Sequence, residues 1–338
     1  MGILEHIIIL TLLLLVAIAI TRLKDLLAVV MLMGVYGLLS ASFFVIMDAV
    51  DVAFTEASVG AGISTILMLT AISLTGRTVS PIGHKPVLAM ILVIITGGLL
   101  VYATLDMPYY GLVDAPANLH VSPRYIHDSL HEIGIPNAVT SVLASYRGFD
   151  TFGEVVVIFT AGIGVLALLS VPSPTPQEDT NEIKSQNIAM HHQHLVLRVI
   201  SKLLIPFILL FGLYVQFHGD FGPGGGFQAG VIFAAAIILY AMLFGLNTAR
   251  KAVSLPLVRL VSALGVLLYG SVGIVSLLNG GNFLDYNVLL PDPVAGQHIG
   301  ILLIELGVGI TVASVMIIIF FNFAGRNGHL LNNQSRRK

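Results

Sequence analysis

The segment VQFHGDFGPGGGFQAGVI, from Val215 to Ile232, separates two long apolar runs at about 196–217 and 225–246. Each run is long enough to cross the ~30 Å hydrocarbon core of a membrane as a helix. The segment contains six glycines, a residue that adopts φ > 0 and lets two helices approach closely, so it predicts a tight reversal between two membrane spans. It is not a phosphate-binding loop, because no lysine follows the glycines, and its DFG triplet lacks the other kinase motifs.

The whole chain is strongly apolar, like the two runs that flank this segment. Of its 338 residues, 56% are hydrophobic and 10% charged, whereas soluble domains carry about 25% charged residues. This predicts an all-α polytopic membrane protein, since helices satisfy their own backbone groups in lipid. The absence of cysteine excludes disulfides, thiolate catalysis and thiolate-bound zinc or iron–sulfur centres in this chain. The net charge of −2 does not indicate a nucleic-acid partner.

Nine apolar runs have the length of a membrane-spanning helix. In chain order they lie at about 3–21, 26–47, 52–75, 86–105, 152–171, 196–217, 225–246, 256–278 and 297–323. The first is expected to be a retained span, because it lacks the basic start of a signal peptide. With the N-terminus outside, all but Arg124 and Arg147 of the 16 lysines and arginines lie in cytoplasmic segments. The positive-inside rule therefore predicts an outer N-terminus and a cytoplasmic C-terminus.

A polar, proline-bearing segment divides the chain into five spans and four. We expect it to be a cytoplasmic linker, and we see no internal repeat of the kind that inverted-repeat transporters contain. The predicted parts are a three-helix domain at 1–80, a two-helix domain at 81–171, the linker at 172–194 and a four-helix domain at 195–338.

The long outer loop of the two-helix domain, 106–150, is predicted to contain two short amphipathic helices. The first begins at Ser122-Pro123 and stops at Gly134, and the second follows Pro136 and ends at Gly148. Apolar residues recur on one face of each helix. We expect both helices to lie on the outer membrane surface or against a partner. A solvated loop is the alternative.

Three glutamates fall within the apolar runs, where a carboxylate costs about 2.5–3.5 kcal/mol. They are Glu56, Glu154 and Glu305. Burial raises the pKa of a carboxyl group, which allows it to exchange a proton or hold a cation near neutral pH. Glu56 is surrounded by glycine, serine and threonine, which admit water or a local helix irregularity. The alternatives are a structural hydrogen bond for Glu56 or Glu305 and a helix-capping role for Glu154.

Further polar candidates lie at the predicted outer face. His218 and Asp220 form a candidate proton-loading pair, with Gln228 about one turn into the next span. A structural turn with hydrogen bonds at the helix ends is the alternative. Asp48 and Asp51 flank another outer turn, where they would concentrate cations or simply be solvated loop acids. The hinge glycines are Gly219, Gly222, Gly224, Gly225 and Gly226. Because no lysine or arginine lies mid-span, we expect that the chain does not translocate ions alone.

The remaining histidines do not predict a metal site. His127 and His131 share a helix face but have no third ligand nearby, and the HHQH segment at 191–194 lies in the linker. We therefore expect no catalytic residues, no metal centre and no cofactor other than transported Na⁺ and H⁺.

The segment HGDFGPGGGFQAGVIFAAAIILYAMLFG, from His218 to Gly245, resembles the signature of the B-type subunit of Mrp-type multisubunit cation/proton antiporters. The resemblance covers about 194–325. Upstream, the stretch 25–72 with its FTEA motif is similar to the D-type subunit of membrane-bound hydrogenases, and YRGFDTFGE at 146–154 is similar to their E-type subunit. Such D- and E-type domains also form the C-terminal end of the large A-type antiporter subunit. The chain therefore resembles three family pieces fused as three, two and four helices.

The resemblance implies a membrane subunit of a Na⁺/H⁺ antiporter that contributes to pH homeostasis and is related to respiratory complex I. It implies Glu56 and Glu154 as acids of the ion path, other antiporter subunits as partners (large A and D types, small C, E, F and G types) and a prokaryotic cell membrane with its lipids as the location. Two alternatives stay open: an ion-pumping subunit of a redox-driven complex such as a membrane-bound hydrogenase, and a non-conducting scaffold between antiporter subunits.

Overall fold

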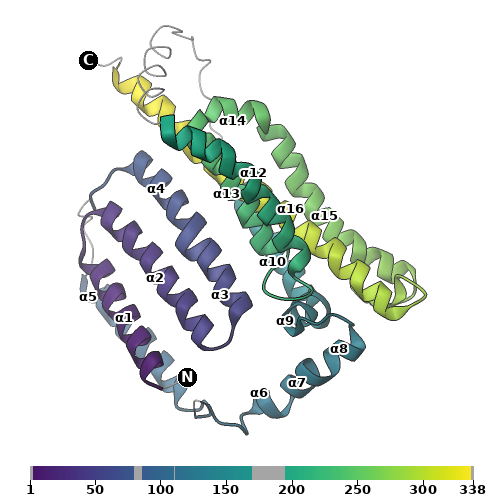
Figure 1. Cartoon of the computed structure of the whole chain (residues 1–338). Coiled ribbons are helices and arrows are strands. Elements are labelled where there is room, and N and C mark those ends of the chain that lie inside the picture. Colours follow the sequence, from purple (N-terminus) through teal and green to yellow (C-terminus); the bar gives the residue numbers. More distant parts are fainter. Residues whose placement is uncertain (1–2, 80–85, 110, 170–194, 336–338) are drawn as a thin grey trace.

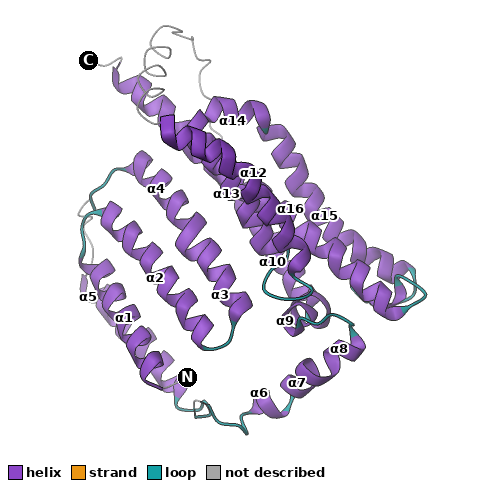
Figure 2. Cartoon of the chain, in the orientation of Figure 1, coloured by secondary structure: helices purple, strands orange, loops and turns teal. Residues whose placement is uncertain are grey.

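The computed structural model describes residues 3–79, 86–109, 111–169 and 195–335. Within these ranges the chain is helical and contains no strand (Figure 2). Nine of the described helices are long and apolar enough to cross a membrane, in the order that the sequence predicts. The linker at 172–194 lies outside the described residues, and so does the HHQH segment.

The first three spans lie side by side, with the second between the other two (Figure 1). They are α1 (Ile3–Arg22), α2 (Leu26–Ile46) and a third span assembled from α3 (Val50–Glu56), η1 (Ala57–Ile63) and α4 (Ser64–Thr75). Asp25 caps α2 and forms an ion pair with Arg77 at 3.0 Å, which ties the end of the third span to the start of the second.

The third span is irregular, because η1 is a π-helical segment between two α-helices. It packs closely on α2: a side chain at Gly37 would collide with the backbone of Gly60. Small residues on both helices permit this approach. The local irregularity expected from the glycine-rich sequence around Glu56 is therefore confirmed.

The next span is α5 (Pro86–Thr104), and its residues from Val87 to Thr104 are almost all exposed. The segment that follows, predicted from the sequence to lie outside the membrane and called the outer segment below, contains short helices. They are α6 (Pro116–Leu119), α7 (Val121–Pro123), η2 (Arg124–Asp128), α8 (Ser129–Glu132), α9 (Ala138–Thr140) and η3 (Ser141–Tyr146). The two predicted helices are thus present, one ending before Gly134, which has φ +83°, and one after Pro136. Gly148 begins the next span and does not end the short helix.

The remaining spans pack around the last helix, α16 (Pro293–Ser335), which continues beyond its predicted end at 323. They are α10 (Gly148–Leu169), α12 (Leu195–His218), α13 (Gly226–Phe244) and α15 (Leu255–Leu278), with short α14 (Leu246–Ala252) and η4 (Tyr286–Val288) in the connections. Glycines allow the close contacts: side chains at Gly226 or Gly230 of α13, or at Gly265 of α15, would collide with α16. The buried core of the molecule therefore surrounds α16.

Candidate functional site

The glycine-rich turn between α12 and α13 packs against α16. Gly225 has φ +104°, a conformation that favours glycine, and its N–H donates to the carbonyl of Val215 at 3.0 Å. Gly226 lies directly against the carbonyl oxygen of Glu305 on α16, with no space for a Cβ atom. The turn is therefore the tight reversal that the sequence predicts, and it brings Glu305 to the hinge.

Asn137 fastens the outer segment to this turn. Its side-chain amide donates to the carbonyls of Gly219 at 3.0 Å and Gly222 at 3.1 Å, and its backbone N–H donates to the carbonyl of Asp220 at 3.0 Å. The hydroxyl of Thr140 donates to the same Gly219 carbonyl at 2.7 Å. Sequence reasoning did not identify Asn137, although an asparagine after Pro136 at a helix start is a recognisable N-cap, and its Oδ1 does accept from the N–H of Val139.

Asp51 reaches the same turn from the N-terminal helices. Its carboxylate accepts from the N–H of Gly224 at 3.3 Å and from the Asn137 amide at 3.5 Å. The view of Asp51 as a solvated loop acid is therefore wrong: the residue lies in the first turn of α3 and is partly buried. Asp48, by contrast, is exposed in the turn before α3 with φ +58°.

A second hydrogen bond joins α3 to α13, one helical turn after Asp51. Gln228 is buried on α13, and its side-chain N–H donates to the hydroxyl of Thr55 on α3 at 2.9 Å. The Gln228 Oε1 atom and the Glu305 Oε1 atom both lie near the Cβ side of Gly225. Oxygen atoms from α13 and α16 therefore face the same space beside the turn.

This space is a cavity of about 360 Å³ where the three predicted helical domains meet. Three carboxylates line it: Asp51 from α3, Glu154 from α10 and Glu305 from α16. Its other polar side chains are Thr55, Thr140, Thr151 and Gln228, and most of the remaining wall is apolar. A mostly apolar cavity with a few converging polar groups is the usual form of a binding site.

Glu305 has no hydrogen bond from any other side chain within the described residues, in contrast to the structural role considered for it. Its carboxylate lies over the glycine turn, close to Gly219 and Gly225, and experiences the like charges of Asp51 and Asp220. An unbonded carboxylate in such a position is free to take up a proton or a cation.

The two other predicted glutamates occupy different positions. Glu154 lies in the second turn of α10, because the helix begins at Gly148, and its side chain lines the cavity. Glu56 ends α3, and its carboxylate lies over Gly60 of the π-helical segment, away from the cavity lining. The structure therefore brings Glu154, Glu305 and Asp51 together but leaves Glu56 apart from them.

The predicted pair of His218 and Asp220 is not formed. The ring of His218 stacks on Tyr214 at a centroid distance of 4.9 Å, whereas the carboxylate of Asp220 lies 3.9 Å from Nδ1 of His298 on α16. Partial burial raises the pKa of Asp220, and the nearby His298 opposes this shift. Sequence reasoning missed His298, because the partner lies 78 positions away on a helix whose docking only the fold determines.

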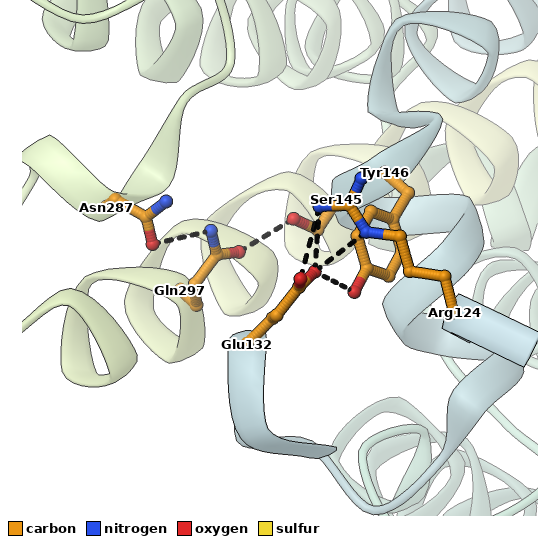
Figure 3. A network of polar contacts seen from close by, with 6 residues as sticks. All are labelled: Arg124, Glu132, Ser145, Tyr146, Asn287 and Gln297. Atoms are coloured by element: carbon orange, nitrogen blue, oxygen red, sulfur yellow. Dashed lines mark hydrogen bonds and ion pairs between the residues drawn. The ribbon is translucent and has the colours of Figure 1, made fainter. Parts of the chain in front are cut away.

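Two polar groups lie next to each other, one within the outer segment and one between this segment, α16 and η4 (Figure 3). Arg124 pairs with Glu132 at 3.1 Å, and Glu132 also accepts from the Tyr146 hydroxyl. Beside them, Ser145 donates to Gln297 at 2.8 Å, and Gln297 donates to Asn287 at 3.0 Å. The members of each group satisfy one another, so both groups are structural.

Metal-ligand groups are not gathered in the described part of the chain. Among these residues no group of three or more histidine, aspartate or glutamate side chains is placed to hold a metal ion. His127 lies in η2 and His131 in α8.

Comparisons with known proteins match the chain in three pieces. The family model described as "Domain related to MnhB subunit of Na+/H+ antiporter" matches residues 196–318. The MbhD and MbhE models, which describe the D-type and E-type subunits of MBH, match residues 11–77 and 85–187. The chain is 35% identical over 140 residues to the putative antiporter subunit mnhB2 of Staphylococcus aureus strains Newman and JH1, across 40% of this chain and 98% of the relative.

Two solved structures share the fold. A chain of the Mrp complex from Dietzia sp. DQ12-45-1b matches with a TM-score of 0.74 and 24% identity, over 94% of this chain and 34% of that chain. The present chain thus spans about a third of the length of its match. A chain of the membrane-bound sulfane sulfur reductase, an archaeal respiratory membrane complex, matches with a TM-score of 0.52 and 29% identity, over 71% of this chain and 98% of that chain.

Proposed function

The chain belongs to the family of domains related to the MnhB subunit of Na⁺/H⁺ antiporters, and we propose that it works as a membrane subunit of a multisubunit antiporter that exchanges Na⁺ for protons. It would contribute part of the ion path and an assembly surface, and would catalyse no covalent reaction. Its place would be a prokaryotic cell membrane. The large A and D types and the small C, E, F and G types of antiporter subunit would be its partners.

The observation that carries this proposal is the cavity with its three carboxylates, Asp51, Glu154 and Glu305. In an apolar surrounding an ionised carboxylate is costly unless a cation or a proton neutralises it. Protons and Na⁺ would therefore compete for the same groups, and this competition is the physical basis of exchange. The threonine hydroxyls and the Gln228 amide oxygen supply further oxygen ligands, the kind that hard cations prefer.

Several partners would have to complete the path. No lysine or arginine lies in the middle of a span among the described residues, so the chain offers no buried cation to drive protons between its acids. We propose that separate subunits supply the missing cations.

The proposal is tested by Glu305→Gln in the assembled complex. Sodium-dependent proton movement in membrane vesicles should fall by about a hundredfold, the scale that a positioned proton carrier contributes. Asp150→Asn is a matched control, because Asp150 is an exposed carboxylate one turn before Glu154, paired with Arg147 at the surface. If the intact complex exchanges ions normally with Glu305→Gln, the chain is a scaffold and the proposal is wrong.

The proposed orientation has the N-terminus outside and the C-terminus in the cytoplasm. Because the chain contains no cysteine, single-cysteine variants give an unambiguous test. Asp48→Cys, in the exposed turn before α3, should react with a membrane-impermeant maleimide applied outside. Lys251→Cys, at the end of α14, should react only from the cytoplasmic side. The opposite labelling pattern would reverse the proposed topology.

A second candidate function is an ion-pumping subunit of a redox-driven complex. The likeness to a chain of an archaeal respiratory membrane complex, over 98% of that chain, favours it. Any redox centre would belong to other subunits. Iron or nickel in the purified complex, in proportion to this chain, would support the redox-driven role over the antiporter.

A further inference from the structure

His298 lies beside the glycine-rich turn that borders the carboxylate cavity. It lies in the second turn of α16, with Nδ1 3.9 Å from the Asp220 carboxylate. Its Nε2 atom lies close to Gly134 of the outer segment: a Cβ atom added at that glycine would be 3.4 Å from it. His298 therefore fills the junction between the glycine turn, α16 and the outer segment.

Within the pair, the side chain of Asp220 is less exposed than that of His298. The side chain of His298 is 42% exposed and that of Asp220 is 22% exposed. Glu305, which lines the cavity, lies against the same turn: its Oε1 atom would be 3.3 Å from a Cβ atom at Gly219, the residue before Asp220. Asn137 connects the same regions, since its backbone N–H bonds to Asp220 and its side chain to Asp51. Titratable groups thus extend from the outer surface to the cavity wall.

We propose that His298 and Asp220 form the outer proton-exchange pair of this cavity, with His298 taking protons from the outer solution and Asp220 handing them toward Glu305. This inference rests on the proposed function and adds a residue, His298, that was not a candidate in the sequence. It assigns His218 no part in proton transfer, because that ring stacks on Tyr214.

Charge balance within the pair gives the mechanism. A protonated His298 stabilises the Asp220 carboxylate, and a neutral His298 leaves Asp220 in surroundings that favour its protonated form. Protonation of His298 therefore favours release of the proton on Asp220, and the residue before Asp220, Gly219, lies against the Glu305 carboxylate.

Among the described residues, no other charged group forms an ion pair with His298 or Asp220. Asp51 on α3 and Glu305 on α16 add negative charge on the cavity side. On the outer segment, Arg124 and Glu132 neutralise each other. At the end of α12, His218 is held by its stacking on Tyr214.

The test compares His298→Gln with the matched variant His218→Gln in the purified complex. A hydrophobic carbodiimide labels protonated carboxyl groups in apolar surroundings, and mass spectrometry of the peptide that contains Asp220 measures the labelling at each pH. His298→Gln removes the cationic partner, so the midpoint of labelling should move to higher pH by about 0.5 to 1. His218→Gln should leave the midpoint unchanged. Equal yields of copurified subunits establish that both variants assemble.

Exchange activity gives a second readout. The pH profile of sodium-dependent proton movement in vesicles should shift with His298→Gln and keep its wild-type shape with His218→Gln. Unchanged labelling and an unchanged profile with His298→Gln, or an equal shift with His218→Gln, would overturn the inference. If the wild-type complex shows no exchange, the proposed function fails, and the labelling curves still decide whether His298 controls the proton on Asp220.

Discussion

The spans α13 and α16 of the C-terminal part and the spans α1 and α5 of the N-terminal part have similar hydropathy but bury their surfaces very differently. Mean hydropathy is 2.8 for α1 and 2.4 for α5, against 2.2 for α13 and 2.5 for α16. Yet none of the apolar stretch of α1 or α5 is buried, whereas 44% of that of α13 and 61% of that of α16 are. Apolar composition places a helix in the membrane and does not decide which neighbour it packs against.

Small residues at the contacts account for the difference. Lipid chains are as apolar as leucine side chains, so helices associate in a membrane through close packing. Glycines of α13 and α15 lie directly on α16, but no atom lies within 4 Å of the Cβ positions at Gly97 and Gly98 of α5. The exposed faces of α1 and α5 are therefore available to lipid or to other subunits.

The largest expected effect in this comparison is that of Gly226→Ala. The added methyl would collide with the carbonyl oxygen of Glu305, which should cost about 1–3 kcal/mol or more. Gly97→Ala on α5 is the matched control and should leave stability unchanged or raise it by up to about 1 kcal/mol. Thermal unfolding of the purified complex in detergent measures both. Equal melting temperatures for wild type and Gly226→Ala would contradict the packing argument.

The next effect concerns whether the exposed N-terminal region takes part in transport. Glu56 ends α3 directly before the π-helical segment and does not line the cavity, and its role is still a prediction from the sequence. If it belongs to the relay, Glu56→Gln should lower exchange by about tenfold, equivalent to about 1.4 kcal/mol, without loss of assembly. Vesicle exchange assays and subunit copurification measure the two quantities. Full activity would make the N-terminal helices a spacer.

A smaller effect is expected at the outer turn of the C-terminal region. Burial raises the pKa of Asp220, so the folded state binds this proton more tightly than the unfolded state. The stabilisation is complete below the unfolded pKa and is lost as the pH rises through the folded pKa. Asp220→Asn should therefore stabilise the complex at pH 7 by about 1 kcal/mol or less and have little effect near pH 4. Melting curves at both pH values test this, and a destabilised variant at pH 7 would reverse the sign.

The smallest effect is expected at the ion pair of Arg124 and Glu132 within the outer segment. The Tyr146 hydroxyl and Arg124 lower the pKa of Glu132, so its contribution is present at neutral pH and is lost as the pH falls through the folded pKa. Both members of the ion pair are well exposed, and Glu132→Gln should cost only about 0.5 kcal/mol at pH 7. Melting temperatures should converge with wild type in acid. A large loss at pH 7 would contradict the small contribution expected for an exposed ion pair.

Much of the fold followed from local sequence. The observed spans begin and end within a few residues of the predicted ones, except at the extended C-terminal end of α16, because hydropathy and helix length are properties of one segment. The glycine reversal and the irregular third span were predicted for the same reason: the effect of glycine and other small residues on backbone conformation is local to the segment that contains them.

The short helix at 138–146 shows where local patterns were insufficient. Its apolar residues Val139 and Leu143 are exposed, while Thr140, Ser141 and Ala144 are buried. The small polar face is the one that docks, because the Thr140 hydroxyl bonds to Gly219 and the Tyr286 hydroxyl bonds to the carbonyl of Ala144. The polarity pattern of this helix alone does not indicate that these residues will be its partners.

By itself the sequence determined a nine-span helical membrane protein, its glycine turn and its set of intramembrane acids, since each depends on one stretch of chain. Only the tertiary structure decided which acids share a cavity. Asp51, Asn137 and His298 acquire their places through contacts with the turn at 219–226, and each contact joins residues more than 70 positions apart. Pairings at such separation depend on how the helices pack, and that packing is set by close contacts between small residues that hydropathy does not measure.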